Sequence, residues 1–350
     1  MNLEPSAEQV LLRDMVRRFL ADHRPPAGPG HASTPDEEWG ALGELGVLSL
    51  LAPEAAGGLG GGPQEIAILA EEMGRALAMT PLAESIVLCA GLIADGGSGD
   101  QRAAWIEPLL SGERLVAYAG SGEGYGALAI APSGDGWVLN GERRQVRRGG
   151  DAAALIVEPD AAGAGLLLVE PSASGLSVLP YRTADGEMAA LVRFEGVQVR
   201  PSDRLAVTAE QHGRALALAK LAVVAEMVGL MDTLYAATVD YVKQRRQFGV
   251  PIASFQVIQH RVARLFILLE QSRSMLLRAV GSDDARRGRT VAEAFAYVAD
   301  AALRLAQDAT QLHGGMGVTD ELDVGRGHRR LLVLSHLFGG AITARAALAA

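Results

Sequence analysis

The C-terminal part of the chain contains three long, alanine-rich stretches whose apolar residues recur at helical spacing. They run from about Glu210 to Lys243, from Phe255 to Val280 and from Val291 to Leu312, and a last helix is expected from Arg330 onward. Helices of this length bury an apolar stripe by packing against one another, usually as an antiparallel bundle. The sequence therefore predicts a C-terminal four-helix bundle over residues 206–350.

The middle of the chain has a different sequence pattern, in which short runs of residues that favour β-strands alternate with turn signals. The runs lie at residues 116–119, 137–139, 154–157, 166–169, 176–179 and 190–194. The turn signals include Ser133–Gly136, Asn140-Gly141 and Asp185-Gly186. Short strands at this spacing are typical of a small sandwich or barrel, so residues 115–205 are predicted to form an antiparallel β-domain.

Residues 1–114 are predicted to form an N-terminal helical domain. Ser6 and Gln9 make a capping box ahead of an amphipathic stretch. The glycine-rich loop Gly57–Gly62 is rejected as a dinucleotide loop, because no clear strand precedes it and the G-x-G-x-x-G spacing is incomplete. The order of helices, strands and helices predicts an α+β fold.

The charge of the chain argues against a nucleic-acid partner. The chain has 41 acidic and 32 basic residues, a formal net charge of −9, and no run of Lys or Arg offsets it, whereas the phosphate backbone requires a basic face. A CoA thioester is also an anion, so a local cluster (Arg143, Arg144, Arg147 and Arg148) is one candidate for binding it. A solvated, charged strand end is the other interpretation of these arginines.

The cysteine content and the hydropathy of the chain indicate in which cellular compartment the protein is found. Cys89 is the only cysteine and lies in an apolar run, so an intrachain disulfide is excluded and a core position is expected. His, Asp and Glu do not cluster at ligand spacing, so no metal is expected. The N-terminus lacks a signal-peptide pattern, and no apolar stretch reaches the ~20 residues of a bilayer span. We therefore expect a cytoplasmic protein without a membrane span.

Two motifs in the C-terminal part carry a family resemblance. The first is Arg-x-Gln-Phe-Gly-x-Pro-Ile at Arg245–Ile252, followed by Phe255-Gln256, and the second is Gln-x-x-Gly-Gly-x-Gly at Gln311–Gly317. In this order, with a β-domain upstream that contains Leu139–Gly141, they resemble the flavin-binding signatures of the acyl-CoA dehydrogenase family. The resemblance spans essentially the whole chain. It implies the acyl-CoA dehydrogenase-like fold and FAD as the cofactor.

The resemblance also implies roles for individual residues. The arginine matching Arg245 pairs with the flavin pyrophosphate, where a guanidinium fork suits phosphate oxygens, and the glycines matching Gly314 and Gly315 permit close backbone approach. The implied cofactor-binding set is Arg245, Gln247, Phe248, Gln256, Gln311, Gly314 and Gly315. In the family these residues reach a flavin whose ring a neighbouring subunit holds, so a homo- or hetero-oligomer with another chain of the family is implied.

The family's catalytic base is missing from the expected positions. The family's reaction removes the α-proton of an acyl-CoA while a hydride leaves the β-carbon for the flavin, which requires a carboxylate in an apolar pocket. Phe338 occupies the usual glutamate position before Gly339-Gly340, and Ala219 occupies a second family position. The catalytic residue is therefore unknown. Glu226, in an apolar helical stretch, is an alternative base, and a buried ion pair with an Arg or His of the bundle is its other interpretation.

The motif on the flavin-ring side is changed as well. The family's Trp-Ile-Thr falls on Gln145–Arg147, so the covering aromatic and the bonding hydroxyl are both absent. The segments Thr319–Leu322, Ala225–Gly229 and Glu270–Ser274 resemble the small subunits of bacterial two-gene acyl-CoA dehydrogenases. Those enzymes act on unusual acyl chains such as dicarboxylic or steroid side-chain thioesters. In them the partner carries the base and holds the flavin ring.

Three hypotheses follow. The leading one is a subunit in the FAD-dependent α,β-desaturation of an acyl-CoA or carrier-bound acyl thioester, with the catalytic glutamate supplied by a partner chain. The second is a self-sufficient, homo-oligomeric flavoenzyme with Glu226 as a relocated base. The third is a flavin-free, non-catalytic scaffold with the same fold.

Overall fold

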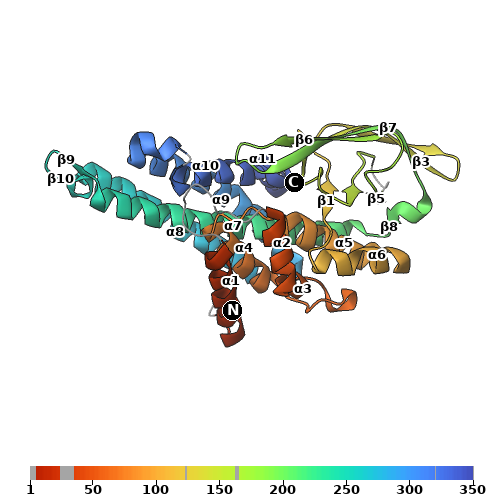
Figure 1. The fold of residues 1–350 in the computed structure, drawn as a ribbon, viewed down its shortest axis with the longest axis horizontal. Helices are drawn as coiled ribbons and strands as arrows, with labels where there is room; N and C mark the ends of the chain where they lie inside the picture. The colour runs from red at the N-terminus through yellow and green to blue at the C-terminus, as the bar shows by residue number, and fades with distance from the viewer. Residues whose placement is uncertain (1–4, 24–34, 123, 162–164, 320, 350) are drawn as a thin grey trace. The chain divides into compact units, whose positions relative to one another are not determined.

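The computed structural model describes residues 5–23, 35–122, 124–161, 165–319 and 321–349 (Figure 1). The chain divides into two compact units. The helical unit consists of Met1–Thr34, Pro63–Met79 and Lys220–Ala350, and the strand unit of Pro35–Gly62 and Thr80–Ala219. The three domains expected from the sequence, 1–114, 115–205 and 206–350, partition the chain differently, and their boundaries remain a prediction.

The helical unit is built from α1, α4, most of α7, and α8 to α11. Their bounds are Ala7–His23, Pro63–Arg75, Ala209–Gln244, Gln256–Val280, Asp284–His313, Asp323–Leu334 and Gly340–Ala349. The predicted bounds of α7 and α8 agree with the structure to within one residue. The helix expected from Val291 begins earlier because the Asp283 side chain caps it by accepting from the Arg286 N–H. The last predicted helix is two helices, separated by a break at Leu337–Gly339.

Two glycines allow α4 and α7 to cross at backbone contact. A Cβ added at Gly74 would lie 2.1 Å from the carbonyl oxygen of Glu226, and one added at Gly229 would lie 2.0 Å from that of Glu71. Both clashing atoms belong to helix backbone, which cannot rotate away as a flexible side chain can. Only glycine therefore fits at this crossing.

Replacing Gly229 with alanine is expected to destabilise the protein, because the new methyl group forces the two helices apart. The free energy of unfolding, measured by urea titration, should fall by about 1–3 kcal/mol. Gly213→Ala is the matched control, since Gly213 lies on the same helix with no atom within 4 Å of an added Cβ. The control should be neutral or stabilising by about 0.5–1 kcal/mol, and equal midpoints for the two variants would contradict the backbone crossing.

The strand unit contains short helices and two four-stranded sheets. The helices are α2 (Pro35–Glu44), α3 (Val47–Leu50), the π-helical η2 (Leu82–Ala90), α5 (Gly91–Gly96) and α6 (Gly99–Leu110). Strands β1 to β8 occupy Val116–Ala119, Leu128–Ser133, Gly136–Arg147, Ala154–Val157, Leu166–Val169, Leu176–Arg182, Met188–Val199 and Arg204–Leu205. The sheet orders are β1-β4-β5-β8 and β2-β3-β7-β6.

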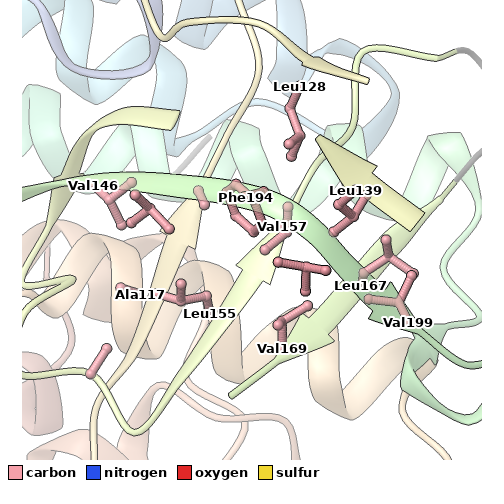
Figure 2. Close-up of a cluster of buried hydrophobic side chains, with 14 of the residues drawn as sticks. Ala117, Leu128, Leu139, Val146, Leu155, Val157, Leu167, Val169, Phe194 and Val199 are labelled. Carbon is pink, nitrogen blue, oxygen red and sulfur yellow. The ribbon is translucent and has the colours of Figure 1, made fainter. Parts of the chain in front are cut away.

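The two sheets enclose an apolar core, as the sandwich prediction requires. Figure 2 shows Leu155 and Val157 of β4 and Leu167 of β5 facing Val146 of β3 and Phe194 of β7. All pairings in the two sheets are antiparallel except β1 with β4, which is parallel. The parallel pair is possible because the chain leaves β1, builds β2 and β3 in the other sheet, and only then returns as β4.

One predicted turn is wrong. Asn140-Gly141 lies inside β3, where the register with β7 shifts between Leu139 and Asn140. Gly141 has a φ of 135°, and the Asn140 side-chain oxygen accepts a hydrogen bond from the Gly196 N–H at 2.8 Å. A β-bulge and a tight turn both favour residues that tolerate positive φ, so the same dipeptide fits either one.

Candidate functional site

A two-residue hairpin joins α7 to α8 in the helical unit. Its strands are β9 (Arg246-Gln247) and β10 (Val250-Pro251), and Gln247 pairs with Val250. Phe248 and Gly249 form the turn with φ values of 53° and 83°, and positive φ at both positions is characteristic of a type I′ hairpin turn. The first of the two sequence motifs therefore projects beyond the ends of two long helices (Figure 1).

The structure brings the two motifs to the same end of the helical unit. The rings of Tyr241 and His313 stack with their centroids 4.3 Å apart. The Tyr241 hydroxyl also donates a hydrogen bond to the His313 carbonyl at 3.3 Å. Tyr241 lies one turn before Arg245, and His313 directly precedes Gly314, so this contact fastens the start of one motif to the other.

The seven predicted cofactor-binding residues are all exposed: Arg245, Gln247, Phe248, Gln256, Gln311, Gly314 and Gly315. Phe248 is 92% exposed, and its ring makes an edge contact with Phe255 at the start of α8. A Cβ added at Gly314 or Gly315 would meet no atom within 4 Å. No ion pair of the Arg245 guanidinium occurs within the described part of the chain. An exposed arginine without an ion pair in the described ranges, at the same end of the unit as two open glycines, fits the phosphates of a dinucleotide.

Neither expected base position carries a proton acceptor. Phe338 lies in the break between α10 and α11 with φ 51° and ψ 36°, a left-handed conformation that costs a non-glycine residue about 1–2 kcal/mol. The two glycines that follow also have positive φ. Ala219 is fully buried on α7.

Glu226 is part of a buried ion pair, which agrees with the second interpretation of this residue. It is 8% exposed, and its Oε1 lies 2.8 Å from Nε and 2.6 Å from a terminal nitrogen of Arg330. Arg330 lies on α10 and is 1% exposed. A carboxylate held by a guanidinium is poorly suited to accept a proton, because protonation would remove the negative charge that the carboxylate presents to the buried cation.

Arg147 lies in the segment that matches the family's flavin-ring motif, and it belongs to a buried ionic cluster of the strand unit. It donates a hydrogen bond to Glu84 of η2 at 2.6 Å and another to Glu187, just before β7. All three residues are buried. The position that matches the family's bonding hydroxyl is therefore occupied by a guanidinium committed to two internal carboxylates.

The neighbouring arginines are also bound internally. Arg143 is fully buried and donates to the carbonyls of Gly126 and Glu158 and to the carboxylate of Asp160. Burial acts to raise the pKa of Asp160, but hydrogen bonds from Arg143 and the Leu128 N–H outweigh it and lower that pKa. Arg148 is buried beside Asp151. Both interpretations from the sequence, a CoA-binding cluster and a solvated strand end, are therefore wrong for Arg143, Arg147 and Arg148.

A further cluster of titratable side chains in the strand unit was not predicted. The Tyr118 hydroxyl donates to Glu158 at 2.7 Å and lies 2.9 Å from Nε2 of His212. Burial, and then the charge of Glu158, raise the pKa of Tyr118, whereas burial lowers that of His212 against the opposing effect of Glu158. The cluster connects the ends of β1 and β4 to the first turn of α7. No sequence signal links residues so far apart.

Cys89 is buried, as expected. Within the described ranges, no group of three or more His, Cys, Asp or Glu side chains is arranged to hold a metal. No single described helix has the length and hydropathy to cross a bilayer, although the bent pair of α10 and Leu337–Ala349 passes that test together. Asp320, in one of the resemblance segments, lies outside the described residues.

Family comparisons cover both ends of the chain. The family description "Acyl-CoA dehydrogenase, C-terminal domain" matches residues 210–349, and "Acyl-CoA dehydrogenase, N-terminal domain" matches residues 6–113. The probable acyl-CoA dehydrogenase YngJ of Bacillus subtilis is 30% identical, with 93% of each chain covered. Acyl-CoA dehydrogenase FadE27 of Mycobacterium tuberculosis is 31% identical, with 83% of this chain and 81% of the relative covered.

Two solved structures of complexes have similar folds. The ChsE4–ChsE5 complex from Mycobacterium tuberculosis aligns with a TM-score of 0.90 and 28% identity, covering 100% of this chain and 98% of the other. The steroid ACAD Tcur3481–Tcur3483, a G363A variant, aligns with a TM-score of 0.84 and 29% identity, covering 98% and 96%. Both comparisons therefore extend over the helical and the strand-bearing parts of the chain.

Proposed function

Because this chain belongs to the acyl-CoA dehydrogenase family of FAD-dependent oxidoreductases, we propose that it is one subunit of a heteromeric acyl-CoA dehydrogenase. The complex desaturates an acyl-CoA or carrier-bound acyl thioester between its α and β carbons. The observation that carries this proposal is the contrast between the nucleotide-binding residues, which are present, and the catalytic base, which is absent from both expected positions. Seven residues for the nucleotide part of FAD lie exposed at one end of the helical unit, whereas Phe338 and Ala219 stand where a base is required.

This chain contributes binding and orientation of the FAD nucleotide. Arg245 pairs with the pyrophosphate, and the open backbone at Gly314 and Gly315 allows the phosphates to approach closely. Gln247, Gln256 and Gln311 offer side-chain amides, and Phe248 offers an aromatic surface at the hairpin tip. FAD supplies the hydride acceptor of the reaction.

The partner chain holds the flavin ring and supplies the catalytic glutamate. The buried cluster of Arg147, Glu84 and Glu187 supports this assignment, because it leaves neither a hydroxyl nor an aromatic side chain at the ring-side motif. Binding of a flavin ring at this motif would require the ion pairs of the cluster inside the strand unit to break. A base on a second chain also explains how both base positions of this chain can be apolar.

The similar solved complexes support a two-chain assembly and a class of substrate. The ChsE4–ChsE5 structure contains two different chains, and the Tcur3481–Tcur3483 structure is described as a steroid enzyme. We propose a bulky acyl thioester, such as one carrying a steroid side chain, as the substrate of the complex. The cytoplasmic location expected from the sequence is part of the same proposal.

The test is the flavin content and activity of the chain with and without its partner. The chain purified alone should be colourless and inactive towards acyl-CoA thioesters. Mixed with a family member that has glutamate at the position of Phe338, it should gain bound FAD and dehydrogenase activity. A yellow, active preparation of the chain alone would instead support the self-sufficient enzyme, and a chain that never gains flavin with such a partner would support the scaffold.

A further inference from the structure

Three titratable side chains of the strand unit form a connected cluster, and the proposed function uses none of them. Tyr118 belongs to β1, Glu158 directly follows β4, and His212 lies in the first turn of α7. The Tyr118 hydroxyl is 2.7 Å from Glu158 Oε2 and 2.9 Å from His212 Nε2. These three residues are called the His212 cluster below. The side chain of His212 is 18% exposed and that of Glu158 is 26% exposed, so both are partly buried.

The two contacts of the Tyr118 hydroxyl determine which nitrogen of His212 carries a proton. A hydroxyl has one proton to donate, and an ionised carboxylate only accepts. Tyr118 therefore donates to Glu158, and burial together with the Glu158 charge raises the pKa of Tyr118, so the hydroxyl keeps its proton. The Tyr118 oxygen then accepts from Nε2–H of His212. This assignment follows from the hydrogen-bond network, and a neutral imidazole protonated on Nε2 completes it.

A second proton on His212 finds no acceptor in this arrangement. Nδ1 lies 4.0 Å from Glu158 Oε1, beyond hydrogen-bond distance, and it makes no hydrogen bond within the described ranges. Glu158 Oε2 also accepts from the Ser121 N–H at 3.0 Å. A partly buried imidazolium with an unmatched N–H is unfavourable. In agreement with this geometry, burial lowers the pKa of His212 below its usual value of about 6.5, against the opposing effect of Glu158.

The elements that carry or adjoin the cluster have further charged or titratable side chains, on α5, η2, α7 and the segment before β2: Asp95, Cys89, Glu210, Arg214 and Tyr125. Arg214 is paired with Asp95 at 3.2 Å, and Glu210 is exposed. Cys89 and Tyr125 act on Tyr118 and raise its pKa further. Glu158 is thus the charge that faces His212 directly.

The cluster also holds the start of the segment between β1 and β2. Glu158 accepts from the Ser121 N–H at one end, and Arg143 donates to the Gly126 carbonyl at 3.0 Å at the other. Residues 120–126 include four glycines. Because glycine has little conformational preference of its own, the conformation of this segment depends on such attachments at its ends.

We propose that the His212 cluster is a pH-sensitive contact, which holds the first turn of α7 against the ends of β1 and β4 while His212 is neutral. Uptake of a second proton releases that turn to solvent, where water accepts from Nδ1–H, and loosens the hold on Ser121. The released form binds the proton more tightly than the closed form. The closed form is therefore most stable above about pH 6.5 and loses stability as the pH falls below that value. All three residues belong to the strand unit, so the proposal depends on neither the partner chain nor FAD.

Nitrogen-15 NMR of the full chain, labelled in histidine, tests the proton assignment. The signals of His212 are identified by their loss in His212→Gln. They should show the proton on Nε2 at about pH 7.5 and should titrate below about pH 6.5. A His212 that titrates above about pH 6.5, or that carries its proton on Nδ1, would overturn the proposal, because acid would then strengthen the contact with Glu158.

Amide hydrogen exchange measures the release itself. After correction for the pH dependence of the exchange chemistry, protection of the Ser121 amide should fall about 3- to 10-fold between about pH 7.5 and about pH 5 in the wild-type chain. His212→Gln keeps an N–H donor for Tyr118 but does not titrate, so its protection should stay constant. His328→Gln is the matched control, because His328 is another histidine whose pKa is lowered by burial, on α10 of the helical unit.

The control should retain the wild-type response. A wild-type chain whose Ser121 protection does not change with pH would overturn the proposal. So would a response that persists in His212→Gln or disappears in His328→Gln, since the titrating group would then lie elsewhere.

Discussion

Replacing Arg245 with alanine is expected to weaken FAD binding by the complex about 10- to 100-fold. Hydrogen bonds to charged groups contribute about 1.5–3 kcal/mol, and about 1.4 kcal/mol corresponds to a factor of ten. Because the Arg245 side chain is exposed and makes no ion pair in the described chain, the variant should fold normally. The measurement is the dissociation constant of FAD, obtained from flavin fluorescence during titration of the apo-complex.

Arg246→Ala is the matched control for this experiment. Arg246 is the next residue along, is also exposed, and donates a hydrogen bond to the Gly249 carbonyl within the hairpin. A pyrophosphate contact specific to Arg245 predicts that the control retains FAD. Equal losses in the two variants would indicate a general dependence on positive charge and would contradict the assigned contact.

Replacing Glu226 with glutamine is expected to lower the free energy of unfolding by about 3–5 kcal/mol, because it removes the negative charge of a carboxylate that is bound to the buried guanidinium of Arg330. Urea titration of the isolated chain measures this loss. The turnover of the folded complex should stay near that of wild type, since the proposed catalytic base belongs to the partner chain. If Glu226 were a relocated base, turnover would instead fall by about 10²- to 10⁴-fold.

Arg330→Gln separates the two explanations. It breaks the same ion pair but keeps the carboxylate, so it should destabilise the chain by a similar amount. A double variant, Glu226→Gln/Arg330→Gln, should cost less than the sum of the single changes, because the two residues interact directly. If only the Glu226 change abolished turnover per folded complex, Glu226 would be the base and the partner-supplied glutamate would be wrong.

The parts of the fold that the sequence predicted best are those with strong local signals. Strands β1, β4 and β5 were predicted with the observed bounds, because each is a short, mostly buried run of residues that favour strands. The hairpin between α7 and α8 has positive φ at Phe248 and Gly249, and a phenylalanine at the first of these positions is not a residue that signals such a turn. Strand β2 was missed because it contains alanine and a proline and is fixed by pairing with β3.

The candidate site also contains residues that the sequence predicted and residues that it did not. The motif residues at Arg245–Gln256 and Gln311–Gly315 were found because each motif is contiguous, although only the stacking of Tyr241 on His313 shows that they share one end of the unit. The ionic cluster of Arg147 was not predictable. Its partners Glu84 and Glu187 lie 63 and 40 residues away in the sequence, and only the folded strand unit brings them together.

The ratio of FAD to protein chains in the purified complex tests directly whether the two unlike chains share one flavin. We expect one FAD for each pair of unlike chains, because in the proposed complex this chain binds only the nucleotide part of FAD and has no site for the flavin ring. Flavin absorbance, set against protein concentration from amino-acid analysis, gives the ratio. One FAD for every chain would contradict the shared flavin site, since it would require this chain to hold a flavin ring where Arg147 is paired with Glu84 and Glu187.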